Sequence, residues 1–211
     1  MCREIDCGGQ GTEEWLKARL GVPSASNFAK VVTTAGKRST SFNGYVNALI
    51  AEKLTGDPTY VKITEPMERG TSLEDEARAM YQLIEEVDIR QVDFIKHPNM
   101  EVGCSPDGLI DKEQDGLIGG LEIKCPLQGT HVEYLRAGKL PSKYLLQVQG
   151  CMFVTGRGFW DFMSYHPKMR PFMIRTYRDD DLINELETNL QEAVLMLEEG
   201  VNKFQWDGVN T

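Results

Sequence analysis

The sequence has few of the residues that build soft-metal and redox sites. Its five cysteines are scattered, with no two in a Cys-x-x-Cys pair, and its three histidines show no ligand spacing. These spacings argue against a zinc ribbon, a thioredoxin-like redox site and an iron–sulfur cluster, all of which need closely spaced ligands. We therefore expect reduced structural thiols, with the histidines in loops or at the surface.

Long apolar runs are also missing. No stretch approaches the roughly twenty apolar residues that a membrane-spanning helix needs. The first six residues have neither the basic nor the apolar part of a secretory signal. A chain of 211 residues suits one domain with a sizeable core. We expect a single cytoplasmic domain.

Positive charge is the third shortage, since the formal net charge is −9. Phosphate contacts depend on Lys and Arg, so this average argues against a nucleic-acid partner. The same balance suits a carboxylate-rich metal site. Any surface that binds DNA must then gather its positive charge locally, in a basic patch or channel.

Hydrophobic periodicity and turn residues predict a mixed α/β fold with a central sheet flanked by helices. Helices are expected over residues 12–20, 41–56, 72–86, 143–154 and 179–204, with Thr12 and Ser41 as N-caps and Gly21 and Gly56 as terminators. Strands are expected over residues 87–95, 101–105, 117–125, 159–165 and 172–177. The predicted domain covers residues 1–211, with N-terminal helices over 12–56, a catalytic core over about 69–178 and a C-terminal helix over about 179–204.

Two carboxylates and a lysine are predicted to meet at one end of the sheet. Glu122 and Lys124 alternate with Leu121 and Ile123, so in a strand the charged pair shares one face over a cleft. Asp107 stands 15 positions before Glu122, at the end of a preceding strand, and a hairpin would bring the two together. A charged pair within an apolar strand is costly unless the protein uses it.

This trio suits metal-dependent phosphodiester hydrolysis. A divalent cation neutralises the phosphate and lowers the pKa of an attacking water. Mg²⁺ prefers one or two carboxylates plus water, and a nearby lysine can orient the nucleophile or stabilise the transition state. Glu74, on the helix that precedes the sheet, is a candidate fourth member.

The Pro-Asp and Glu-x-Lys pattern resembles the PD-(D/E)xK nuclease signature. Around it, six blocks in order resemble the phage lambda exonuclease and YqaJ-type viral recombinase family: Trp15–Gly21, Ser24–Ser26, Arg69–Ala77, Cys104–Gly108, Leu121–Pro126 and Gln147–Gln149. The similarity covers nearly the whole chain. It implies a restriction-endonuclease-like core, a phage or prophage origin in a bacterial host, and a processive 5′→3′ exonuclease that digests one strand of double-stranded DNA.

The resemblance also implies roles for individual residues. Asp107, Glu122, the Ile123 carbonyl and Glu74 would hold one or two Mg²⁺ ions, with Mn²⁺ as a substitute, and Lys124 would be the catalytic lysine. The terminal 5′-phosphate would lie against Arg19, Ser26, Ser105 and Gln147. Arginine offers a fork that suits phosphate, and hydroxyl and amide donors complete the cradle.

The family's assembly gives further expectations. Its members form trimeric rings around a DNA channel and work with a single-strand annealing protein, so the 3′ overhangs made here would serve recombination. A ring would let basic residues line the channel of an acidic protein. Lys37 and Arg38, in a flexible loop, are candidates for grasping the duplex. The connection from Asp107 to Glu122 is longer than expected for the lambda enzyme, which leaves the local loop geometry open.

Simpler roles compete for several of these residues. Asp107 lies in a Pro-Asp-Gly turn sequence and can serve as turn and ligand at once. Glu74, in the first turn of its predicted helix, could merely complement the helix dipole. Arg19 could pair with Glu13 or Glu14. Ser26 could cap a helix that begins near Asn27, and either Gln147 or Gln149 could face the cleft.

Two other functions fit the same fold. A site-specific or structure-selective endonuclease would use the same trio, and it would nick covalently closed circular DNA. A DNA-binding protein that has lost catalysis would be free to lose Asp107, Glu122 and Lys124, yet all three are present.

Overall fold

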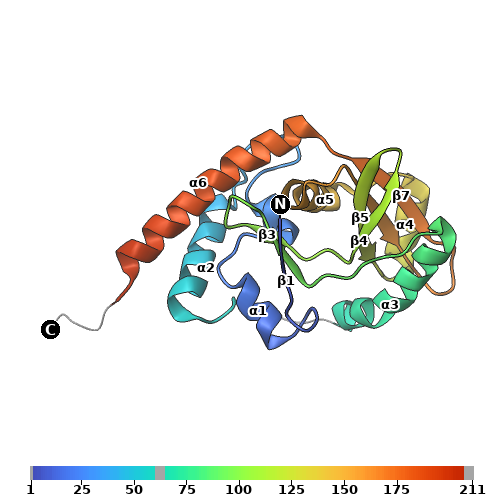
Figure 1. Ribbon diagram of the computed structural model, residues 1–211, viewed down its shortest axis with the longest axis horizontal. Coiled ribbons are helices and arrows are strands. Elements are labelled where there is room, and N and C mark those ends of the chain that lie inside the picture. Colours follow the sequence, from blue (N-terminus) through green and yellow to red (C-terminus); the bar gives the residue numbers. More distant parts are fainter. Residues whose placement is uncertain (1, 60–64, 207–211) are drawn as a thin grey trace.

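Two sheets organise the chain in the computed structural model, which describes residues 2–59 and 65–206 (Figure 1). The first is a small antiparallel sheet in the order β1-β2-β3, made of Arg3–Ile5, Phe94–Lys96 and Gly103–Cys104. The second has the order β4-β5-β6-β7, made of Gly108–Gln114, Leu117–Lys124, Phe159–Ser164 and Phe172–Tyr177. Its β5–β6 pair is parallel and the others are antiparallel, so the predicted mixed sheet is confirmed.

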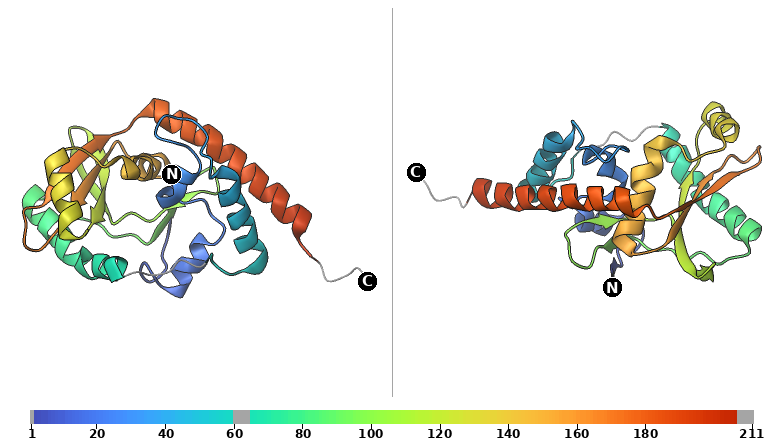
Figure 2. Two further views of the ribbon diagram at one scale, coloured as in Figure 1. Left: turned by 180° about the vertical axis from the view of Figure 1, so that it is seen from behind. Right: turned by 90° about the horizontal axis from the view of Figure 1, so that it is seen from above.

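Helices flank this four-stranded sheet on both faces (Figures 1 and 2). Helix α3 (Glu65–Glu85) packs on one face through Ala77 and Tyr81. Helices α4 (Gln128–Ala137) and α5 (Ser142–Thr155) follow β5 and cover the other face before the chain returns as β6. Connecting parallel neighbours in this way requires a long crossover, which the two helices supply.

The remaining helices build a second layer around α5. They are α1 (Glu13–Arg19), a short 3₁₀ helix η1 (Ala25–Lys30), α2 (Phe42–Thr55) and the long C-terminal α6 (Asp180–Phe204). Helix α6 runs along α2 (Figure 1), and both share an apolar core with α5 and η1. None of the described helices combines the length and apolar character needed to cross a membrane.

Several helix ends follow the sequence signals. Thr12 caps α1 by accepting from the Trp15 N–H at 3.1 Å, and Gly56 ends α2 in the left-handed conformation with a φ of 75°. Asp179 caps α6 by accepting from the Leu182 N–H at 3.0 Å. Ser41 holds the N-cap position of α2 but forms no side-chain capping bond. These predicted boundaries are therefore confirmed, apart from the Ser41 cap bond.

Two predicted elements differ from the structure. Helix α3 extends from Glu65 rather than from near Ser72, and Pro66 is compatible with this because a missing N–H costs no helical hydrogen bond in the first turn. Glu74 is therefore well inside the helix, and the first-turn interpretation was wrong. Residues 87–95 were predicted as a strand. Only Phe94–Lys96 is one, and Arg90 forms an isolated bridge with Leu109.

Two adjacent glycines let β5 lie close to the aromatic start of β6. Gly119 is paired with Phe159, and Gly120 with Trp160. A Cβ on Gly119 would lie 2.1 Å from the Phe159 ring, and one on Gly120 would lie 2.4 Å from the Trp160 ring. Larger residues at these two positions would push β5, which carries Glu122, away from β6.

The tryptophans differ in burial, and one histidine lies where it was not expected. Trp160 is fully buried, whereas Trp206 is 85% exposed. His131 is fully buried on α4 rather than in a loop or at the surface. Its ring nitrogens contact Ser164 Oγ (2.8 Å) and the Arg170 carbonyl (3.0 Å), which supply both partners that a buried imidazole needs.

Candidate active site

The β4–β5 hairpin brings Asp107 to the end of β5. Gly108 is paired with Leu121, so Asp107 immediately precedes the hairpin opposite Glu122. Its Oδ2 accepts from the Ile123 N–H at 2.6 Å. The predicted hairpin is confirmed, but Asp107 stands before β4 instead of ending an earlier strand. That difference arises because residues 108–114 form a strand that was not predicted.

Alternation along β5 sorts its side chains as predicted. Leu121 and Ile123 are buried in the core beneath α3. The side chains of Glu122 and Lys124 form an ion pair, with 1% and 30% of their surfaces exposed. Gln147, on α5, donates its amide to Glu122 Oε1 at 2.6 Å. Glu122 therefore lies at the floor of the site, covered by α5.

Glu74 reaches the same site from α3. It lines a cavity of about 390 Å³ together with Gly70, Thr71, Asp107, Ile123, Lys124, Cys125, Pro126 and Tyr144. The Glu74 carboxylate pairs with Arg78, one helical turn further on, at 2.5 Å. We call Glu74, Asp107, Glu122 and Lys124 the carboxylate cluster.

Burial of like charges shifts the protonation of the carboxylate cluster. Burial, together with Asp107 and Glu74, raises the pKa of Glu122 to about 7, and Lys124 opposes this shift. Burial also raises the pKa of Asp107 and, with help from Asp107, that of Glu74. Burial alone would lower the pKa of Lys124, but Glu122 and Asp107 outweigh it and raise that pKa. Such a cluster favours a bound cation.

The donor set of the carboxylate cluster fits a hard divalent cation. Among residues 2–59 and 65–206, no group of three His, Cys, Asp or Glu side chains is placed to hold a metal ion. Mg²⁺ needs less, because it keeps several waters and takes one or two carboxylates. Glu122 Oε2 is buried and has no hydrogen-bond partner within the described part of the chain. An unpaired buried carboxylate oxygen is costly unless a cation uses it.

A second polar group surrounds Arg19. The Arg19 guanidinium lies 4.1 Å from the centre of the Trp15 ring and donates to Ser105 Oγ at 2.9 Å. Trp15 donates its indole N–H to the same hydroxyl at 3.0 Å. Arg19 also lies 3.5 Å from Ser24 Oγ. We call Trp15, Arg19, Ser24, Ser26 and Ser105 the arginine group.

The arginine group resolves several open alternatives. Glu13 pairs with Lys17, not with Arg19. Ser24 is the N-cap residue of η1, and Ser26 lies inside η1 with its hydroxyl 3.4 Å from that of Ser24. Burial lowers the pKa of Arg19, but a guanidinium stays charged near neutral pH. Ser105 belongs to this group and Asp107 to the carboxylate cluster, so two adjoining sites share one short segment.

The two glutamines of α5 have different partners. Gln149 is buried and bonds the main chain of Tyr177 and Asp179, at 2.9 Å each, which is a structural role. Gln147 therefore is the one that faces the cleft. Its amide is directed at Glu122 rather than at Arg19, so the structure brings it to the carboxylate cluster and not to the arginine group.

Lys37 and Arg38 lie in a closed turn between η1 and α2. The Thr33 N–H donates to the Lys37 carbonyl at 2.7 Å, and Val32 bridges Arg38. Arg38 forms an ion pair with Glu192 on α6 and lies 4.5 Å from the Phe42 ring centre. Lys37 is exposed. The turn is thus tied to α6, in contrast to the flexible loop expected from its composition.

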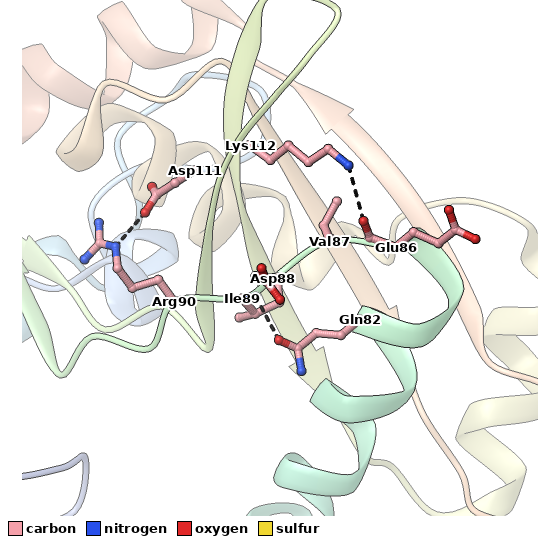
Figure 3. Close-up of a pocket in the computed structure, with 8 residues that line it drawn as sticks. All are labelled: Gln82, Glu86, Val87, Asp88, Ile89, Arg90, Asp111 and Lys112. Carbon is pink, nitrogen blue, oxygen red and sulfur yellow. Dashed lines mark hydrogen bonds and ion pairs between the residues drawn. The ribbon is translucent and has the colours of Figure 1, made fainter.

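A larger hollow of about 580 Å³ lies between the end of α3, the segment that follows it and β4 (Figure 3). Figure 3 shows Arg90 directed at Asp111, and Lys112 at the main-chain oxygen of Glu86. Arg90 and Asp111 in the lining of this hollow pair with each other, and the lining as a whole contains both acidic and basic side chains. No member of the carboxylate cluster or the arginine group lines it.

Sequence reasoning missed three residues at the site. Trp15, Arg78 and Tyr144 contact the predicted functional residues, and Lys124 Nζ lies 5.6 Å from the Tyr144 ring centre. For Trp15 and Arg78 a signal existed, because each is four positions from Arg19 or Glu74 on one helix and such positions are neighbours. Tyr144 is distant from Lys124 in sequence and gave no comparable signal.

Comparisons with known proteins place the chain in a family. Residues 14–158 match the family of YqaJ-like viral recombinase domains. An alkaline exonuclease from Laribacter hongkongensis is 38% identical, with a TM-score of 0.80 over 91% of this chain and 95% of that one. Its complex with dAMP matches equally well.

A more distant structure shares the fold alone. A phage-related exonuclease from Haemophilus somnus 129PT is 14% identical, with a TM-score of 0.66 over 86% of this chain and 96% of that one. Among curated protein sequences, none matches this chain significantly.

Proposed function

This chain belongs to the family of YqaJ-like viral recombinase domains and is a nuclease, and on that ground we propose that it digests one strand of double-stranded DNA from a 5′-phosphorylated end. The observation that carries the proposal is the pair of adjoining sites. A carboxylate cluster suited to a cation and an arginine group suited to an anion lie at opposite ends of Ser105–Asp107.

The carboxylate cluster carries the cleavage in this proposal. Asp107, Glu122, Glu74 and the Ile123 carbonyl would hold one or two Mg²⁺ ions, or Mn²⁺ in their place. When bound, the cation supplies positive charge at the scissile phosphate and lowers the pKa of the attacking water. Lys124 orients that water and offsets charge that develops on the phosphate. Gln147 holds one oxygen of Glu122, so the other oxygen is free for the cation.

In this proposal the arginine group binds the terminal 5′-phosphate of the DNA. A terminal 5′-phosphate carries more charge than an internal one, and the guanidinium fork of Arg19 with the Ser105 and Ser26 hydroxyls offers charge-assisted bonds to it. Trp15 keeps the guanidinium and the Ser105 hydroxyl in place. The role predicted for Gln147 at this phosphate stays a prediction, since its amide contacts Glu122.

The product and partners follow from the same reaction. Removal of nucleotides from the 5′ end leaves 3′ single-stranded overhangs, which are the substrate of strand annealing. A complex of the related alkaline exonuclease contains dAMP, a mononucleotide such as this reaction releases. We propose a homotrimeric ring around the DNA and a single-strand annealing protein as partner, with Lys37 and Arg38 at the duplex.

Linear and covalently closed circular DNA test this proposal. With Mg²⁺, the protein should release acid-soluble nucleotides from a linear duplex and leave the closed circle intact, and EDTA should stop the reaction. Rapid nicking of the circle would show an endonuclease. Binding to linear DNA without release of nucleotides under Mg²⁺ or Mn²⁺ would show an inactive DNA-binding protein.

A further inference from the structure

Arg78 is a buried arginine that joins two of the segments on which the carboxylate cluster stands. Its side chain is 10% exposed, and its Nη2 lies 2.5 Å from Glu74 Oε1, one turn earlier on α3. Its Nε donates to the main-chain carbonyl of Asp107 at 3.0 Å. One guanidinium therefore bonds a side chain of α3 and the backbone of the segment that leads into β4.

The remaining contacts of Arg78 prevent its side chain from turning away. Nη1 lies 2.6 Å from Asp75 Oδ1, although the side chain of Asp75 is almost fully exposed. In the orientation that satisfies both its oxygen and its nitrogen, the Gln91 amide oxygen accepts from Arg78 Nε at 3.2 Å. The planar fork is thus held at all three nitrogens, and its direction dictates where the Glu74 carboxylate lies.

The contact with Arg78 leaves one carboxylate oxygen of Glu74 able to bind a cation. The guanidinium takes Oε1, and Oε2 is outside that pair. Glu74 and Asp107 both line the cavity that holds Lys124, so the arginine fixes the spacing of two carboxylates that repel each other. Groups that orient metal ligands in this way commonly change metal affinity by about 10- to 100-fold when they are removed.

We propose that Arg78 is a positioning residue that holds Glu74 and Asp107 at the spacing needed to bind the divalent cation. This inference rests on the proposed function, because it concerns the same metal site. Arg78 acts through Glu74 and Asp107. A lysine in its place would keep the positive charge but lose the fork that bonds both segments.

Arg157, in the connection between α5 and β6, provides a matched control. Its side chain is 8% exposed and pairs with Asp111, and its Nη1 donates to the carbonyls of Ile110 (2.9 Å) and Gly119 (2.7 Å). Like Arg78, Arg157 is thus a buried arginine that bonds both main-chain carbonyl groups and an acidic side chain. It shares no bonding partner with Arg78, so its loss reports on the fold alone.

The test measures Mn²⁺ binding by the full chain in the absence of DNA, with free Mn²⁺ followed by electron paramagnetic resonance. Arg78→Lys should raise the Mn²⁺ dissociation constant by about 10-fold or more. Arg157→Lys should leave it within about two-fold of wild type, even where the two variants lose similar thermal stability. The Mg²⁺ concentration for half-maximal digestion should rise in parallel for Arg78→Lys only.

A double variant shows whether Arg78 acts through Glu74. In a Glu74→Gln background, the further effect of Arg78→Lys on Mn²⁺ binding should shrink, because the two changes remove one shared interaction. Where Arg78→Lys does not fold, Arg78→Gln serves the same comparison, since it also lacks the fork.

Three outcomes decide the inference. Weakened Mn²⁺ binding in the Arg78 variant but not in the Arg157 variant supports it. Wild-type Mn²⁺ binding by a folded Arg78 variant overturns it and makes Arg78 a structural residue. A wild-type protein that binds no Mn²⁺ and digests no DNA would overturn the proposed metal site, and the inference with it.

Discussion

The carboxylate cluster and the arginine group are neighbours that solve opposite electrostatic problems. The cluster gathers Glu74, Asp107 and Glu122 where burial raises all three pKa values. The arginine group places one buried guanidinium among hydroxyls and an indole. The carboxylate cluster has an excess of negative charge, and the arginine group has an excess of positive charge. The pair therefore suits a cation and a terminal phosphate held side by side.

In the proposed function, cleavage and end recognition therefore use separate residues. Only the segment from Ser105 to Asp107 belongs to both, and its two polar side chains bond different partners. Variants of the cluster should therefore change the rate on every substrate. Variants of the arginine group should change the preference among ends.

Loss of Lys124 should have the largest effect. Lys124→Ala removes the group that we propose to position the attacking water, so digestion should fall by at least about 100-fold on every DNA end. Nucleotide release from linear duplexes with 5′-phosphate and 5′-hydroxyl ends measures this, and circular dichroism checks the fold. Retained activity in a folded variant would contradict the proposed role of Lys124.

Loss of Arg19 should change the preference among ends. Hydrogen bonds to charged groups are worth about 1.5–3 kcal/mol, so Arg19→Ala should reduce the preference for a 5′-phosphate by about 10- to 100-fold. The ratio of kcat/KM on phosphorylated and hydroxyl ends measures it. Lys17→Ala is the matched control, because Lys17 is on the same helix and pairs with exposed Glu13. An equal loss on both ends would contradict the separation.

A smaller effect is expected at Trp15. Trp15→Phe keeps an aromatic ring under Arg19 but removes the N–H that bonds Ser105 Oγ and the Asp93 carbonyl. One neutral hydrogen bond contributes about 0.5–1.5 kcal/mol, so the preference for a 5′-phosphate should fall about two- to ten-fold. The same kcat/KM ratio measures it. A drop as large as that of Arg19→Ala would show that the indole acts on the phosphate directly.

The smallest effect is expected at Lys37. This exposed lysine is a candidate contact with the DNA backbone, so Lys37→Ala should weaken binding to all sequences alike and reduce the salt dependence by about one phosphate contact. Fluorescence anisotropy at several salt concentrations measures it. An unchanged salt slope would remove Lys37 from the DNA path. Arg38 is a poorer candidate, because Glu192 already pairs with it.

The sequence predicted those parts of the site that depend on local patterns. Alternation along β5 places Glu122 and Lys124 on one face, and the turn between Asp107 and Glu122 makes the hairpin. It also predicted the ends of α1, α2 and α6, where capping residues and glycines act over a few positions. Such features can be predicted because they depend on residues only a few positions apart in the sequence.

Contacts between distant segments could not be predicted in the same way. Strand β4 was missed because its exposed middle, Asp111–Glu113, has no apolar alternation. Residues 87–93 have strand-like composition, yet within the described part of the chain their only strand-type pairing is the Arg90–Leu109 bridge. The burial of Glu122 depends on Gln147 from α5, and the fork of Arg78 depends on Asp107. Tertiary packing decides each of these.

A duplex with a phosphate on only one 5′ end tests whether the protein selects the 5′-phosphorylated strand. Each strand carries its own fluorescent label at the 3′ end, and both are followed under Mg²⁺. We predict that the phosphorylated strand is shortened from its 5′ end while its partner stays full length, and that Arg19→Ala degrades both strands at similar rates. Equal degradation of both strands by the wild-type protein, or shortening from the 3′ end, would contradict it.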